Sequence, residues 1–239
     1  MDDKAIRKAK VKITPNFDTI LFDLDDTLHD REKTLRAFIR LFLQKYDGNL
    51  EPDSRSVFEN GFLKMDEQGY RPREEVFTEL NKILTWRRAP ELKEQLAFWY
   101  SEFPKCAEPV SDLYGVLDFF QARNIKMGIV TNGSSAFQNT KIDRLGIRKY
   151  MKTIIISEEV NVRKPDPEIF RLALAEIKSK PGTTLFVGDN PVVDIKGALD
   201  SGLISVWVRN RRTWSAAQYR PDSTIDGLAG LEDLPVAFQ

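Results

Sequence analysis

The sequence predicts an α/β protein in which an all-helical domain is inserted into a parallel-sheet core. Between residues 110 and 210, short apolar runs alternate with amphipathic segments and with turns rich in Gly, Asn, Asp or Pro, a pattern typical of parallel strands joined by helices. One more apolar run, "TILFD" at residues 19–23, lies far before the next one, which begins at Ile125. The segment between these two runs has helical spacing, so we expect an insertion directly after the first strand.

The first strand is expected at "TILF", residues 19–22, because its apolar run is continuous and strands covered on both faces have this pattern. Three carboxylates, Asp23, Asp25 and Asp26, come directly after it. A buried strand therefore ends in mutually repelling charges, and a shared cation would relieve this repulsion.

Four amphipathic helices are expected in the insertion, because apolar residues recur there at three- and four-residue spacing. Their Phe, Leu and Trp stripes are expected to form the core of the insertion rather than a ligand pocket. The helices are expected at residues 31–46, 54–65, 73–84 and 91–103. The predicted domains are residues 1–28 and 108–239 for the sheet core and residues 29–107 for the helical domain.

The second part of the chain is expected to supply four more strands, at residues 125–131, 153–157, 183–189 and 203–208. Pro167 follows Asp166 and Pro191 follows Asn190, so each pair is expected to cap the start of a helix. The tail from Arg220 is expected to add a strand fragment and a short helix that closes the core.

Composition excludes several classes of protein. Hydrophobic residues make up 41% and charged residues 30% of the chain, as in a globular domain. Lys and Arg count 36 and Asp and Glu count 36, so we expect neither nucleic acid nor a membrane surface as a partner. The basic residues Lys4, Arg7, Lys8, Lys10 and Lys12 are expected to form a solvated tail, and Arg209–Arg212 a solvated loop.

One cysteine, Cys106, and one histidine, His29, exclude an internal disulfide and a zinc cluster. The cysteine is expected to be inert, and the histidine to be exposed and without a role. No signal-peptide pattern or membrane-spanning run is visible, so we expect a cytoplasmic protein.

Polar residues follow the predicted strands at the edge where parallel α/β sheets bind their ligands. Clustered carboxylates are costly unless a hard cation shares them, and Mg²⁺ prefers a few oxygen ligands together with water and substrate phosphate. A lysine just before a helix N-terminus would strengthen the binding of a phosphoryl group. The pattern therefore predicts metal-assisted phosphoryl transfer. The candidate residues are Asp23, Asp25, Thr131, Asn132, Lys164, Asp189 and Asp194.

Four motifs make the sequence resemble the haloacid dehalogenase-like hydrolase superfamily. They are "DLDDT" at residues 23–27, "TNG" at 131–133, "KPDPEIF" at 164–170 and "GDNPVVD" at 188–194, and four motifs in this order are specific. The likeness extends from Thr19 to about Val208. It implies a Rossmann-like catalytic core and a helical cap domain that closes over the site and contributes substrate contacts.

The resemblance also implies catalytic roles. Asp23 would be the nucleophile that forms an aspartyl-phosphate, and Asp25 would protonate the leaving group and then activate water. Thr131 and Lys164 would complete the catalytic set, and together with the backbone of Asn132 they would bind the phosphoryl oxygens. Asp23 would then stay ionised while Asp25 is protonated part of the time.

A magnesium site follows from the same resemblance. The side chains of Asp23 and Asp189 and the backbone carbonyl of Asp25 would bind Mg²⁺, and Asp194 would support the site. Asp25 also favours phosphate chemistry, because dehalogenating members lack an acid at that position.

The predicted activity is the hydrolysis of a small phosphorylated metabolite. A phosphomutase would use the same core and stays an alternative, and a phospho-accepting or catalytically silent binding protein is a remote one. Nucleotides, sugar phosphates and phosphoglycolate-like acids all fit the predicted site. A monomer and a dimer fit the sequence equally.

Overall fold

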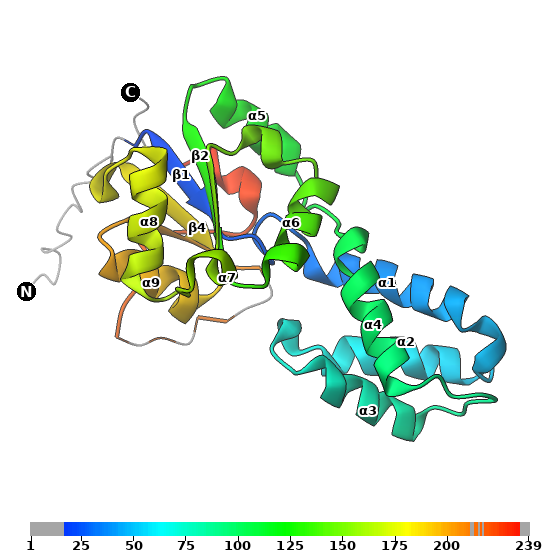
Figure 1. Cartoon of the computed structure of the whole chain (residues 1–239). Helices are drawn as coiled ribbons and strands as arrows, with labels where there is room; N and C mark the ends of the chain where they lie inside the picture. Colours follow the sequence, from blue (N-terminus) through cyan, green and yellow to red (C-terminus); the bar gives the residue numbers. More distant parts are fainter. Residues whose placement is uncertain (1–16, 211–212, 215, 217, 235–239) are drawn as a thin grey trace, which may run out of the picture.

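The computed structural model describes residues 17–210, 213–214, 216 and 218–234 (Figure 1). The predicted basic tail at Lys4–Lys12, together with Arg211 and Arg212 of the predicted basic loop, lies outside the described residues. Within the described part of the chain, no helix is both long and apolar enough to cross a membrane.

The described residues form a six-stranded parallel sheet in the order β3-β2-β1-β4-β5-β6, which is Rossmann-like. The central strand is β1, in which Phe22 lies opposite Ile129 of β2 and Val187 of β4. All the predicted strands are present, including the fragment in the tail. Their bounds are β1 Thr19–Phe22, β2 Lys126–Thr131, β3 Thr153–Ile156, β4 Thr184–Gly188, β5 Ile204–Val208 and β6 Ser223–Ile225.

Helices cover both faces of the sheet, as the continuous apolar strands predict (Figure 1). Side chains alternate along β1, so that Ile20 and Phe22 pack into the cluster that includes α5 and α6, while Leu21 packs into the cluster with α8 and α9. The helix bounds are α5 Leu113–Gln121, α6 Ser135–Arg144, α7 Ser157–Val160, α8 Pro167–Ile177 and α9 Gly197–Asp200, and a short 3-10 turn follows at Leu228–Leu231.

The two predicted helix caps are confirmed. The Asp166 side chain accepts a hydrogen bond from the backbone of Glu168 at the start of α8. The Asn190 side chain accepts from the backbones of Val192 and Val193, at the start of a π-helical turn, Pro191–Lys196, that leads into α9. Both caps satisfy N–H groups that a helix start leaves unpaired, and both fix a loop at the carboxyl edge of the sheet.

The four helices predicted in the insertion are all present. They enclose an apolar core that is separate from the core of the sheet, as the sequence predicts. Phe42 stacks on Phe58 with ring centroids 4.5 Å apart, and Phe62 stacks on Trp99 at 5.5 Å. The bounds are α1 Arg31–Lys45, α2 Ser54–Met65, α3 Arg73–Ile83 and α4 Leu92–Glu102, with 3-10 turns at Asp47–Asn49, Glu67–Gly69 and Pro104–Cys106.

Two segments, residues 28–30 and residues 108–110, connect the sheet core to the insertion, and backbone hydrogen bonds join them to each other. The backbone of Asp30 donates to the carbonyl of Glu108 at 2.8 Å, and that of Val110 donates to the carbonyl of Leu28 at 3.2 Å. These contacts lie next to the loop that follows β1, so the base of the insertion lies beside the candidate site.

Candidate active site

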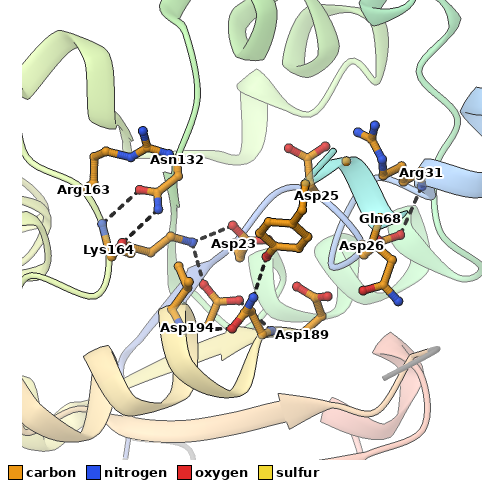
Figure 2. A pocket seen from close by; sticks show the side chains of 14 residues that line it. Asp23, Asp25, Asp26, Arg31, Gln68, Asn132, Arg163, Lys164, Asp189 and Asp194 are labelled. Atoms are coloured by element: carbon orange, nitrogen blue, oxygen red, sulfur yellow. Dashed lines mark hydrogen bonds and ion pairs between the residues drawn. The ribbon is translucent and has the colours of Figure 1, made fainter. Parts of the chain in front are cut away.

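A cavity of about 450 Å³ lies at the carboxyl edge of the sheet, between the core and the insertion (Figure 2). All the predicted site residues except Thr131 line this cavity. Its walls come from the loops after β1, β2, β3 and β4 and from two segments of the insertion. The residues that were singled out because they follow the predicted strands therefore lie together at this cavity.

Lys164 joins two carboxylates at the floor of the cavity. Its Nζ lies 2.6 Å from Oδ1 of Asp23 and 2.7 Å from Oδ1 of Asp194, and the residue is only 4% exposed. Figure 2 shows the lysine reaching between these two side chains. The second oxygen of Asp194 accepts from the backbone of Asn190 at 2.9 Å. A buried charge needs such partners, because burial removes its hydration.

Asn132 fixes the backbone of this lysine. Its Oδ1 accepts from the backbone N–H of Lys164 at 2.9 Å, and its Nδ2 donates to the carbonyl of the same residue at 3.0 Å. The loop after β2 is thereby tied to the loop after β3. The sequence placed both residues at the site but did not predict this link.

Asp23, Asp189 and Asp194 form a buried group that suits a hard divalent cation. Each offers one carboxylate oxygen, and these three oxygens lie within 4.8 Å of one another. Burial, together with Asp194 and Asp25, raises the pKa of Asp23 to about 7, although Lys164 acts in the opposite direction. Lys164 thus pairs with two of these three carboxylates, Asp23 and Asp194. An all-oxygen donor set of this kind fits Mg²⁺.

Asp25 has a separate set of partners. Its Oδ1 lies 2.6 Å from Nζ of Lys141 and 2.8 Å from Nδ1 of His29, and its Oδ2 accepts from Nε2 of Gln138 at 3.0 Å. Burial favours the neutral carboxyl group, but Lys141 and His29 outweigh it and hold the pKa of Asp25 well below its usual value. Without a cation, the contacts therefore favour ionisation of Asp25 over ionisation of Asp23, the reverse of the predicted order.

The prediction that His29 is exposed and incidental is wrong. The side chain is 0% exposed, and its Nε2 lies 2.7 Å from Oγ1 of Thr34 on α1, while Nδ1 faces Asp25. The backbone of His29 donates to the carbonyl of Leu24 at 2.9 Å, so the chain turns back on itself and carries the ring inward. The spacing of four residues between Asp25 and His29 was the available signal.

Lys141 and Gln138 on α6 were missed. Lys141 is 2% and Gln138 1% exposed, and the amide of Gln138 also donates to Oγ1 of Thr131 at 2.6 Å. Both polar residues lie on the buried face of α6 together with Ile142. A lysine and a glutamine at positions where an amphipathic helix has apolar residues were a usable signal.

The insertion contributes Arg31, Gln68, Gly69 and Tyr70 to the cavity wall. Figure 2 shows Arg31 and Gln68 on the side of the cavity away from Lys164. The hydroxyl of Tyr70 accepts from Nδ2 of Asn190 at 2.5 Å, which joins the insertion to the loop after β4. Asn210 of the predicted basic loop donates from Nδ2 to the backbone carbonyl of Asp26 at 2.8 Å.

A buried ion-pair network supports this wall. Two nitrogens of Arg31 donate to the carboxylate of Asp66 at 2.8 Å each, and Arg73 donates to the same carboxylate at 2.7 Å. A Cβ on Gly69 would lie 2.6 Å from the Arg31 guanidinium carbon, and its φ is +88°. Only glycine fits this close approach without displacing the arginine.

Comparison with known proteins identifies relatives over most of the chain. The family model described as haloacid dehalogenase-like hydrolase matches residues 20–208. The glyceraldehyde 3-phosphate phosphatase of Methanopyrus kandleri is 31% identical over 207 residues, which cover 80% of this chain and 83% of that protein. The pyrimidine 5'-nucleotidase YjjG of Escherichia coli is 36% identical over 131 residues, or 54% of this chain, and the match spans only 58% of that relative.

A solved structure has the same fold. The HAD-hydrolase YfnB of Bacillus subtilis, solved with bound magnesium, superposes with a TM-score of 0.71 at 24% sequence identity. The match covers 92% of this chain and 99% of that one, so the sheet and the helical insertion are both included.

Proposed function

The chain belongs to the haloacid dehalogenase-like hydrolases and is a phosphoric monoester hydrolase, and from this premise we propose that it is a magnesium-dependent phosphatase of small phosphorylated metabolites. The observation that carries the proposal is the floor of the cavity. There Asp23, directly after β1, lies 2.6 Å from the ammonium group of Lys164 and beside the carboxylates of Asp189 and Asp194.

In the proposed reaction, a carboxylate oxygen of Asp23 attacks phosphorus and the P–O bond to the leaving group breaks. The contacts of Asp25 with Lys141 and His29 favour its ionised form before substrate binds, so in the proposed reaction it takes up a proton as the negatively charged phosphoryl group binds beside it. It then gives that proton to the departing alkoxide. Asp25 then takes a proton from the water that attacks the aspartyl-phosphate, which releases inorganic phosphate and restores Asp23. Lys164 offsets the charge that gathers on Asp23 and on the phosphoryl oxygens.

The loop after β2 would hold the phosphoryl group. Oγ1 of Thr131 accepts from Gln138, which leaves the threonine's own hydroxyl proton to donate to a phosphoryl oxygen. The backbone N–H of Asn132 would be a second donor. Side-chain contacts between Asn132 and Lys164 support a fixed spacing between these donors and the lysine.

Mg²⁺ would be held by the side chains of Asp23 and Asp189 and by the backbone carbonyl of Asp25, with Asp194 in support. When bound, the ion neutralises negative charge on the phosphoryl oxygens and favours the ionised form of Asp23. The raised pKa of Asp23, about 7, supports a need for added positive charge at this place.

We propose that the insertion, residues 29–107, acts as a cap on a core formed by residues 1–28 and 108–239. Support comes from Gln68 and Tyr70, which lie on the cavity wall. A cap of this kind excludes bulk water and contacts the part of the substrate that is not transferred. The wall is mostly polar, which suits a polar metabolite such as a sugar or triose phosphate, and the M. kandleri relative is named for a triose phosphate.

The test is the nearly isosteric variant Asp23→Asn, assayed on 4-nitrophenyl phosphate. We expect kcat to fall at least about 1,000-fold, because an amide is a far weaker nucleophile, while the circular-dichroism spectrum stays unchanged. Asp143→Asn, at an exposed carboxylate on α6 that pairs with Arg148, is the matched control and should keep full activity. Turnover by Asp23→Asn within tenfold of the parent would refute the proposal.

A further inference from the structure

Helix α6 has two polar side chains where its sheet-facing side would ordinarily be apolar. Lys141 and Gln138 are 2% and 1% exposed, and both lie beside the buried Ile142. Neither residue lines the cavity, and the ammonium group of Lys141 contacts Asp25 and Gln138. Their burial therefore has to be explained by the groups that they contact inside the protein.

The carboxylate of Asp25 is the main partner of both residues. The ammonium group of Lys141 lies 2.6 Å from Oδ1, and the amide of Gln138 donates to Oδ2 at 3.0 Å. Lys141 also donates to the Gln138 carbonyl oxygen at 2.9 Å, which fixes the orientation of that amide. Each oxygen of Asp25 thus accepts a hydrogen bond from a side chain of α6. The Asp25 side chain remains 31% exposed and lines the cavity.

Two further contacts fix the position of α6, one with the sheet and one with the insertion. Gln138 donates to Oγ1 of Thr131 at 2.6 Å, which ties the helix to the end of β2. Phe137 stacks on Phe103 at the base of the insertion, with ring centroids 5.8 Å apart and planes within 7°. Helix α6 is therefore held on one side by the end of β2 and on the other by the base of the insertion, and this fixes the position of Lys141.

We propose that Lys141 is a positioning residue for catalysis, and that with the help of Gln138 it holds the Asp25 carboxylate in the orientation needed for proton transfer to the leaving group. The proposal rests on the proposed function, because it requires Asp25 to be the acid and base. General acid catalysis depends on geometry, and a misplacement of about 1 Å can cost about 100-fold in rate. Lys141 acts on the substrate only through Asp25.

The test compares leaving groups in the variant Lys141→Met. A 4-nitrophenolate group departs without a proton, whereas an alkoxide needs one. We therefore expect kcat/KM, which reports the steps up to formation of the aspartyl-phosphate, to fall about 30- to 100-fold for an alkyl phosphate such as glycerol 3-phosphate and no more than about threefold for 4-nitrophenyl phosphate. Hydrolysis of the aspartyl-phosphate also uses Asp25 and is common to both substrates, so kcat alone would not separate them.

Lys149→Met is the matched control. This lysine lies just after α6 and is exposed, and its replacement should leave both rates unchanged. A structural ion pair alone would lower the melting temperature and leave the ratio of the two kcat/KM values unchanged. Equal losses on both substrates, or a ratio that does not change, would overturn the proposal.

A double variant separates this proposal from the proposed function. If Lys141 acts through Asp25, then adding Lys141→Met to Asp25→Asn should cost no further activity. Multiplied losses in the double variant would overturn the positioning role. If Asp25→Asn alone leaves the leaving-group ratio unchanged, then the acid role in the proposed function is wrong. Should Lys141→Met fail to fold, Gln138→Met makes the same ratio test, because its amide holds the other oxygen of Asp25.

Discussion

Replacing Lys164 with methionine should destabilise the metal-free protein strongly. The lysine is 4% exposed, and its ammonium group contacts Asp23 at 2.6 Å and Asp194 at 2.7 Å. Methionine has a similar length but no charge, so the variant leaves two buried carboxylates without their shared cation. Breaking a buried pair in this way costs about 3–5 kcal/mol.

This cost can be read as a melting temperature. In a protein of this size, 1 kcal/mol shifts the midpoint of thermal unfolding by about 2–4 °C, so Lys164→Met should lower it by about 6–20 °C. Saturating Mg²⁺ should recover part of the loss, because a cation that binds only the folded protein stabilises it and would supply charge at the same carboxylates. Differential scanning calorimetry with and without Mg²⁺ measures both effects.

Lys196→Met is the control for this experiment. Lys196 pairs with Asp200 on an exposed surface, and exposed pairs of this spacing are worth about 0.5 kcal/mol or less. Its loss should therefore shift the midpoint by no more than about 2 °C. If Lys164→Met shifts the midpoint as little as Lys196→Met, then the inferred electrostatic role of Lys164 is wrong.

Two further predictions concern the carboxylates. The pKa of Asp23 is about 7 in the folded protein, whereas an aspartate ordinarily has a pKa of 3.8. Without metal, its contribution to stability is therefore full below about pH 4 and is lost as the pH rises through about 7. Mg²⁺ should therefore raise the melting temperature more at about pH 8 than at about pH 5. A chelator should abolish both this shift and the activity. An equal shift at both pH values would contradict the prediction. Asp25→Asn should lower kcat/KM about 100-fold for alkyl phosphates and much less for aryl phosphates, as steady-state kinetics can establish, and equal losses in kcat/KM would argue against an acid role.

The fold could be predicted because each strand and helix leaves a local pattern. The apolar run of β1 and the three- and four-residue spacing of α1 to α4 are short-range properties. The observed bounds of these elements differ from the predicted ones by at most one residue at either end. The caps at Asp166 and Asn190 are also local, since each side chain bonds backbone groups two or three residues away. Strand order is not local, and it came from the structure.

The residues of the candidate site also fall into those that local sequence predicts and those that it does not. Asp23 and Asp189 could be placed because each follows a strand directly. Lys141 could not be placed in that way, because its partner Asp25 is 116 residues away in the sequence and because a lysine on a helix is ordinarily solvated. The burial of His29 likewise depends on Thr34 and on the paired passages into the insertion. The local sequence could show that Lys141 takes the place of an apolar residue on α6, but not which distant carboxylate it contacts.

The two buried lysines give the two halves of the site different needs for metal. Lys164 is shared by Asp23 and Asp194, with Asp189 close by, so negative charge exceeds positive charge at that end. Lys141 serves Asp25 alone among the carboxylates, with His29 and Gln138 beside it, so that end is balanced without a cation. Removal of Mg²⁺ should therefore loosen the surroundings of Asp23 and leave those of Asp25 in place. In the proposed mechanism, an ion would therefore be needed beside the nucleophile, whereas the protein itself would orient the acid.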